Sequence, residues 1–195
     1  MSKYKITFKK NFRLMLSLVI VIIIGIFVIN QLADNHQLKK ISIGGSFKLK
    51  DENGKVFDSK LIKKKKLIYF GYTFCPDICP FDILKLSKFI DDNPDVIDHI
   101  EFIFITIDPE RDGIEQVKGF LENFNRSITG LTGSVEEIES IIRNFRIYVR
   151  KNNDFAEDQN YLVDHSSLFF LLDENDYYIT HFRPDTFKLK IKEYI

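Results

Sequence analysis

The sequence predicts an α/β fold with a central mixed sheet, preceded by one transmembrane helix. Three observations lead to this prediction: an uncharged apolar run near the N-terminus, apolar β-type segments alternating with helical patterns, and a final pair of such segments separated by a turn. The 195 residues leave room for the anchor and one globular domain of about 150 residues, and a second large domain does not fit.

The apolar run extends from Leu14 to Ala33 and contains no charged residue. As a helix with a rise of about 1.5 Å per residue, it spans roughly the 30 Å hydrocarbon core of a bilayer. A cleaved signal peptide has a shorter apolar stretch and a small-residue cleavage site, and the segment Asn30–Asp34 offers no convincing one. We therefore predict a retained membrane anchor rather than a signal peptide.

Basic residues before the anchor predict its orientation: Lys3, Lys5, Lys9, Lys10 and Arg13. By the positive-inside rule, they place the N-terminus in the cytoplasm and the domain across the membrane. The predicted parts are a basic N-terminus (1–13), an anchor (14–33), a linker (34–45) and a domain (46–195). A mitochondrial presequence is absent from the first residues, which favours a single-pass protein of a bacterial inner membrane with its C-terminal domain in the periplasm. The mitochondrial inner membrane, facing the intermembrane space, is the alternative.

The formal net charge of zero hides an asymmetry between the N-terminus and the rest of the chain. Without the five N-terminal bases, 23 basic residues face 28 acidic ones, a balance of about −5. This balance disfavours a nucleic-acid-binding role. The lysine run Lys63–Lys66 is interpreted as a solvated turn before a buried strand.

The first half of the domain shows a hairpin followed by a β-α-β-α unit. Residues 46–57 alternate apolar and polar around Asn53-Gly54, a pair typical of tight hairpin turns. Residues 67–72 form an apolar strand, and the next segment, 80–90, has helical spacing in Phe81, Leu84, Leu86 and Phe89. A second buried strand is expected at 101–107 and a helix at 113–124. This order favours two parallel central strands with a right-handed crossover.

The second half predicts a capped helix and a terminal hairpin. Ser134 and Glu137 form a capping box before a helix whose apolar face carries Ile138, Ile141, Ile142 and Phe145. Residues 168–172 and 177–182 flank the polar turn 173–176 as antiparallel strands, and a last helix is expected at the C-terminus. Parallel strands, a terminal hairpin and helices on both faces together predict a thioredoxin-like fold with an N-terminal β-hairpin.

The only two cysteines lie where the strand at 67–72 leads into the next helix, in the segment Cys75-Pro-Asp-Ile-Cys79. A four-residue spacing brings both sulfurs to one helical face, and the helix N-terminus favours thiolates. A structural disulfide here would close too short a loop to stabilise the fold much. Redox chemistry or binding of a soft metal ion explains the placement better.

Two cysteines make an incomplete metal site, and one of the four histidines could provide a third ligand. Only His165 directly precedes a buried strand, whose start a thioredoxin-like fold brings against the cysteine loop. Two thiolates and one imidazole suit Cu(I), and Cu(II) with an added water or carboxylate. Structural zinc would require a fourth strong ligand, which Asp77 or Asp164 could supply. Asp164 is better placed to orient the imidazole, with a turn-forming role as the equal alternative.

Four motifs in this order resemble the SCO/SenC family of membrane-anchored copper proteins, which assist assembly of cytochrome c oxidase. The motifs are Tyr69–Pro80, Thr106–Asp112, Gly130–Gly133 and Val163–Ser166, and the resemblance covers essentially the whole domain. It implies that Cys75, Cys79 and His165 ligate one copper ion. It further implies that the domain delivers copper to, or reduces the cysteines of, the CuA site in oxidase subunit II. Other periplasmic copper carriers are expected as further partners.

Three functions compete at this point. A copper chaperone, without turnover of its own, depends on His165, whereas a thiol-disulfide oxidoreductase needs only Cys75 and Cys79 as its catalytic redox pair. A peroxide-reducing role is weakest, because the Thr-x-x-Cys arrangement of thioredoxin-fold peroxidases is missing. We expect a metallochaperone before an enzyme. Asp108 and Arg111 either form a structural turn or shape the surface around the site.

Overall fold

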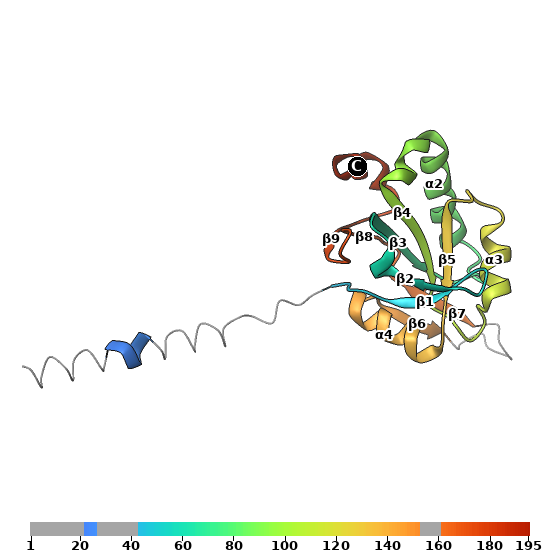
Figure 1. Cartoon of the computed structure of the whole chain (residues 1–195). Helices are drawn as coiled ribbons and strands as arrows, with labels where there is room; N and C mark the ends of the chain where they lie inside the picture. Colours follow the sequence, from blue (N-terminus) through green and yellow to red (C-terminus); the bar gives the residue numbers. More distant parts are fainter. Residues whose placement is uncertain (1–21, 27–42, 153–160) are drawn as a thin grey trace, which may run out of the picture. The chain divides into compact units, whose positions relative to one another are not determined.

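The computed structural model describes residues 22–26, 43–152 and 161–195 (Figure 1). The chain divides into two compact units, Met1–Ile41 and Ser42–Ile195, each described by itself. In the first unit, residues 22–26 are helical. Among the described residues, no helix has the length and apolar character needed to cross a bilayer. Most of the predicted anchor Leu14–Ala33, the N-terminus 1–13 and most of the linker 34–45 lie outside the described residues.

The second unit is built on a seven-stranded mixed sheet with the strand order β2-β1-β5-β4-β3-β8-β9. Strands β3, β4 and β5 are parallel neighbours, and the remaining pairs are antiparallel. The bounds are β1 Lys48–Asp51, β2 Val56–Asp58, β3 Lys65–Gly71, β4 Ile100–Thr106, β5 Ile128–Thr132, β8 Phe169–Leu172 and β9 Tyr178–Phe182. Both predicted hairpins and the parallel central pair are confirmed.

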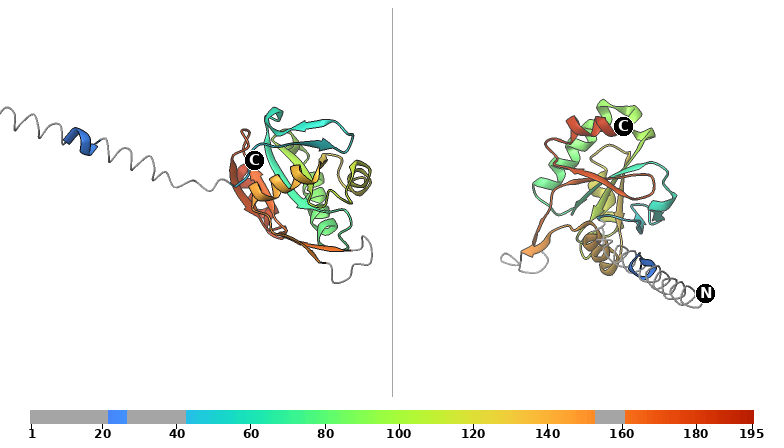
Figure 2. Two further views of the ribbon diagram at one scale, coloured as in Figure 1. Left: turned by 90° about the horizontal axis from the view of Figure 1, so that it is seen from below. Right: turned by 90° about the vertical axis from the view of Figure 1, so that its left-hand side faces the viewer.

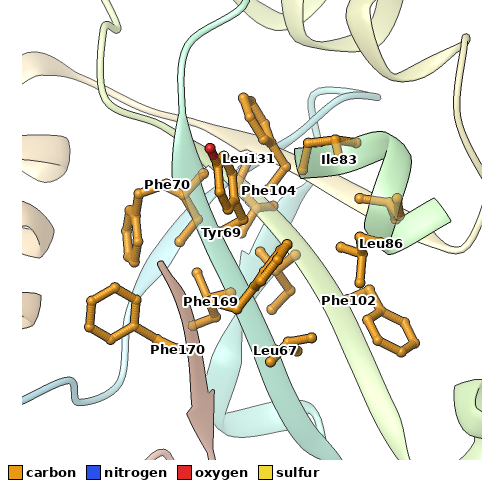
Figure 3. Close-up of a cluster of buried hydrophobic side chains, with 14 of the residues drawn as sticks. Leu67, Tyr69, Phe70, Ile83, Leu86, Phe102, Phe104, Leu131, Phe169 and Phe170 are labelled. Atoms are coloured by element: carbon orange, nitrogen blue, oxygen red, sulfur yellow. The ribbon is translucent and has the colours of Figure 1, made fainter. Parts of the chain in front are cut away.

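Helices cover both faces of this sheet (Figures 1 and 2). Successive side chains of a strand point to opposite faces. Tyr69 of β3 contacts Phe104, which packs on Phe120 of α3, while Phe70 contacts Phe145 of α4. Figure 3 shows the same division, with Ile83 and Leu86 of α2 across β3 from Phe70 and Phe170. The helices are α2 Ile78–Asp92, α3 Ile114–Leu121, α4 Val135–Phe145 and α5 Phe187–Lys190, with short 3-10 turns at Ser59–Leu61, Pro94–Asp98 and Ile191–Tyr194.

A second sheet of two strands, β6 Val149–Asn152 and β7 Leu162–His165, stands apart from the first. The two strands are antiparallel, and Val149 pairs with His165. Neither strand is predicted from the sequence, because each has only four residues and most of them are polar or charged. The segment between them, 153–160, lies outside the described residues.

Two sequence interpretations are wrong in detail. Phe81 and Leu84 of α2 are 59% and 38% exposed, and the helix instead buries a set that starts two residues earlier: Cys79, Ile83, Leu86, Phe89 and Ile90. The lysine run is not wholly solvated, because Lys66 is completely buried and forms an ion pair with Asp176, with Nζ and Oδ1 2.8 Å apart. Lys66 also donates to the carbonyl of Glu174, 3.1 Å away, so its charge is matched inside the fold.

Candidate metal centre

The cysteine loop connects the end of β3 to the start of α2. The last residue of β3, Gly71, leaves no room for a side chain. A Cβ there would lie 3.0 Å from the sulfur of Cys79 and 2.9 Å from the ring of Tyr69. The loop is then held from the β4–α3 connection, where buried Asp112 accepts from the backbone N–H and the hydroxyl of Thr73 at 2.8 and 2.6 Å. Burial raises the pKa of Asp112, and these hydrogen bonds oppose the shift. The loop before Cys75 therefore has a fixed course.

The two thiols differ in exposure. Cys75 is partly exposed and Cys79 is completely buried, and both are free cysteines. The backbone N–H of Cys79 points at the sulfur of Cys75, 3.5 Å away. A hydrogen bond from the Cys79 thiol, helped by this N–H, lowers the pKa of Cys75 to about 5 against the opposing effect of burial. The same hydrogen bond, together with burial, raises the pKa of Cys79.

His165 ends β7 and faces Cys79. Its Nε2 lies 3.2 Å from the Cys79 sulfur, and its Nδ1 lies 3.1 Å from the carbonyl oxygen of Ser166. A carbonyl only accepts, so we assign the ring proton to Nδ1, which leaves the Nε2 lone pair directed at the sulfur. Burial lowers the pKa of His165 and favours the neutral ring, the form that ligates metals.

Two tyrosines enclose the imidazole. The rings of Tyr69 and Tyr72 both meet the His165 ring edge to face, with centroids 6.3 and 6.1 Å away. The hydroxyl of Tyr72 accepts a hydrogen bond of 3.2 Å from the backbone N–H of Val163, which ties β7 to the loop before Cys75. Burial raises the pKa of Tyr72 to about 12, so this hydroxyl stays protonated.

Arg111 makes a second link between the cysteine loop and β7. Its guanidinium lies 3.6 Å from the ring centroid of Tyr161 and 5.2 Å from that of Phe74, and it donates to the Tyr161 carbonyl at 2.8 Å. Asp108, which is fully buried, accepts from Arg111 and from the hydroxyl of Tyr161. The structure thus shows a buried ion pair within the β4–α3 connection, and its contacts with Tyr161 link this connection to the start of β7. The roles of Tyr72 and Tyr161 are not predicted from the sequence, because nothing in the local pattern distinguishes these two residues from core aromatics.

The fold brings the three predicted ligands together around Cys79. Across residues 43–152 and 161–195, no three His, Cys, Asp or Glu side chains are already arranged to hold a metal ion. Cys79 is the shared member of two neighbouring pairs, one with Cys75 and one with His165. The expected orienting role of Asp164 is wrong, because Asp164 is exposed and the Ser166 carbonyl takes that place. Asp77 is exposed as well.

The donor set fits a soft metal of low coordination number. Two sulfurs and a neutral imidazole are the ligands that Cu(I) prefers, whereas tetrahedral zinc requires one more strong donor. The fold and the paired thiols with a facing imidazole define a class: thioredoxin-like proteins that handle electrons or soft metal ions through two cysteines.

Comparison with known proteins identifies the family. The SCO1/SenC family model matches residues 35–195, and the chain belongs to this family. A SCO2-like protein of Rickettsia prowazekii is 41% identical over 156 residues, which are 79% of this chain and 76% of the relative. Protein sco1 of Schizosaccharomyces pombe is 46% identical over 144 residues, 72% of this chain and 54% of that protein.

Solved structures of relatives have the same fold. ScoI of Bradyrhizobium japonicum with copper bound is 36% identical, with a TM-score of 0.70 over 79% of this chain and all of that one. Yeast Sco1 with copper bound is 35% identical, with a TM-score of 0.69 over 78% of this chain and 87% of that one. The thioredoxin-like prediction, with its central mixed sheet, is confirmed.

Proposed function

We propose that this chain is a membrane-anchored copper chaperone that holds one copper ion on Cys75, Cys79 and His165. It delivers the copper to, or reduces the cysteines of, the CuA site of cytochrome c oxidase subunit II. The observation that carries the proposal is the 3.2 Å approach of His165 Nε2 to the sulfur of Cys79, in a loop where Cys75 is the neighbouring thiol. The copper-bound structures of two Sco relatives support it.

The proposed setting follows from the sequence. The apolar run 14–33 serves as the anchor, and the domain 46–195 works in the periplasm of a bacterium, with the intermembrane space of mitochondria as the alternative. One relative comes from the bacterium Rickettsia prowazekii and another, from yeast, is named as mitochondrial, which supports keeping both settings in the proposal. Other periplasmic copper carriers are proposed as further partners.

A copper titration tests the site. The full chain in mild detergent is loaded with Cu(I) when reduced and again after Cys75 and Cys79 have been oxidised to a disulfide, and copper is measured after desalting. We expect about one copper per reduced chain and little on the disulfide form, because a disulfide removes both thiolate ligands. No retained copper in either form would contradict the proposal.

The variant His165→Ala separates the chaperone from a thiol reductase. Loss of the imidazole should weaken copper binding at least about tenfold, because low-coordinate copper would lose one of three ligands. The matched control is His99→Ala, since His99 is exposed and lies before β4, away from the cysteine loop. Equal copper affinity in both variants would mean that the three-ligand site is wrong.

A thiol-disulfide oxidoreductase acting on partner cysteines is the second candidate. The difference between a partly exposed Cys75 with a lowered pKa and a buried Cys79 favours it, because an attacking thiolate must be accessible and a resolving thiol need not be. In this case His165→Ala should leave the reduction of a model disulfide substrate unchanged while Cys75→Ser abolishes it.

A further inference from the structure

Asp82 is a buried carboxylate next to the site with no role assigned so far. It lies on α2, one turn after Cys79, and is only 4% exposed. Carboxylates are seldom buried unless their charge is matched and their oxygens accept hydrogen bonds. The partners of Asp82 therefore indicate what its burial achieves.

The partners of Asp82 come from three different segments. One oxygen, Oδ2, accepts from the hydroxyl of Tyr69 at 3.1 Å and from the hydroxyl of Ser167. The other, Oδ1, lies 3.3 Å from Nζ of Lys85, whose ammonium also pairs with surface Asp185 at 2.6 Å. Tyr69 belongs to β3, which leads to the cysteine loop, and Ser167 follows His165 by two residues.

Side-chain contacts like those of Asp82 are needed to fix the position of His165 relative to Cys79. Cys79 lies at the junction of β3 and α2, while His165 ends a strand of the separate two-stranded sheet. No ladder hydrogen bonds join the two described sheets, and the nearest residue paired with β3 on this side is Phe169, four positions after His165, so backbone pairing alone does not fix the direction of the imidazole. Before His165, the Tyr72 and Arg111 contacts hold β7, and after His165 the Ser167 hydroxyl is held by Asp82.

We propose that Asp82 is a positioning residue that, through Ser167 and Tyr69, holds His165 against Cys79. Asp82 itself touches neither Cys79 nor His165 in any hydrogen bond of the described residues. Tyr69 completes the arrangement, because its ring meets the His165 ring edge to face while its hydroxyl is fixed by Asp82. The inference rests on the proposed copper site for its functional meaning, but the positioning itself belongs to the metal-free protein.

Three variants of the full chain test the proposal. Asp82→Asn keeps the size of the side chain but has one acceptor oxygen and one NH2 group, and this NH2 must face either the two hydroxyls or the ammonium of Lys85, all of which donate to Asp82 in the wild type. Ser167→Ala removes only the link to the His165 segment. Asp185→Asn is the matched control, because it removes the other carboxylate partner of Lys85 and leaves Asp82 in place.

The first measurement is made without copper. Imidazole 15N chemical shifts report the tautomer of His165, and His165→Gln identifies its signals. The wild-type protein and Asp185→Asn should show one tautomer, with the proton on Nδ1, whereas Asp82→Asn and Ser167→Ala should show averaged shifts. All spectra are taken well below the unfolding temperature of each variant, so that a general loss of stability does not produce this change.

The second measurement is copper affinity. Groups that orient a ligand typically change metal affinity by about 10–100-fold, so we expect that range for Asp82→Asn, a smaller loss for Ser167→Ala, and a change below about twofold for Asp185→Asn.

Wild-type 15N shifts and wild-type copper affinity in both Asp82→Asn and Ser167→Ala would overturn the proposal, as would an equal effect of Asp185→Asn. If Asp82→Asn does not fold, Ser167→Ala decides. If the wild-type protein binds no copper, the copper proposal fails, and the 15N shifts still decide the role of Asp82.

Discussion

The two halves of the candidate site are held in different ways. The cysteine half lies where β3 meets α2, and β3 is hydrogen bonded to β4 on one side and to β8 on the other. The histidine half lies on the two-stranded sheet; beyond the short chain segment that leads from His165 to β8, side chains hold it: Tyr72, Arg111 and, through Ser167, Asp82. The comparison teaches that one site can combine a half fixed by the core with a half whose position a few side chains decide.

The largest expected effect is in the main sheet. Asp176→Asn leaves the buried ammonium of Lys66 without its counter-charge, and we expect a loss of about 3–5 kcal/mol in the free energy of unfolding, measured with urea. Asn tolerates the positive φ of Asp176, so backbone strain adds little. The double variant Lys66→Met with Asp176→Asn should recover much of the loss, because it no longer buries a charge. A loss below about 1 kcal/mol in the single variant would contradict the importance of this ion pair.

An intermediate effect is expected in the link to the two-stranded sheet. Tyr72→Phe leaves the buried N–H of Val163 without an acceptor, which costs about 1–3 kcal/mol. This cost should appear as faster hydrogen exchange at the Val163 amide, with a smaller change in the exchange of the β3 and β4 amides. Tyr148→Phe, at an exposed tyrosine before β6, is the control. If β3 and Val163 exchange faster by the same factor, the two halves are not held separately.

The smallest effect is expected on the face away from the site. Ser134→Ala removes the cap of α4, in which the Ser134 hydroxyl accepts from the Glu137 N–H at 3.2 Å, and costs about 1 kcal/mol of stability. Ser134→Asn retains a capping side chain and should stay near wild type. Because α4 packs on the Phe70 face of the sheet, the imidazole shifts of His165 should not change in either variant. A change in them would show that the site responds to stability in general.

The parts of the fold that the sequence predicted have strong local patterns. The hairpin at Asn53-Gly54, the strands β3 and β4 and the capping box at Ser134 each follow from a few neighbouring residues, and all are confirmed. The missed elements lack such a pattern: β6 reads Val-Arg-Lys-Asn, and β7 carries one buried residue, Val163. The burial of Lys66 depends on Asp176, far along the chain, and so could not be inferred from the lysine run itself.

The sequence predicts the proposed ligands of the site but not the residues that hold these ligands in place. Cys75, Cys79 and His165 stood out by residue type and by their places beside buried strands, and they remain the proposed ligands. The residues that orient them, such as the Ser166 carbonyl, Asp82 and Tyr72, are defined by tertiary contacts. Asp164 was chosen because it is adjacent in sequence, but in a strand adjacent side chains point to opposite faces, and this one points to solvent.

The complete burial of Cys79 behind a partly exposed Cys75 sets an order of events for any partner. In the proposed thiol reductase, an incoming sulfur would meet Cys75 first, and Cys79 would then displace that sulfur from Cys75 by forming the internal disulfide. A partner in either proposed function would therefore have to bring its sulfur to Cys75 rather than to Cys79. Any exchange at Cys79 would thus depend on access past Cys75 or past the partly exposed His165.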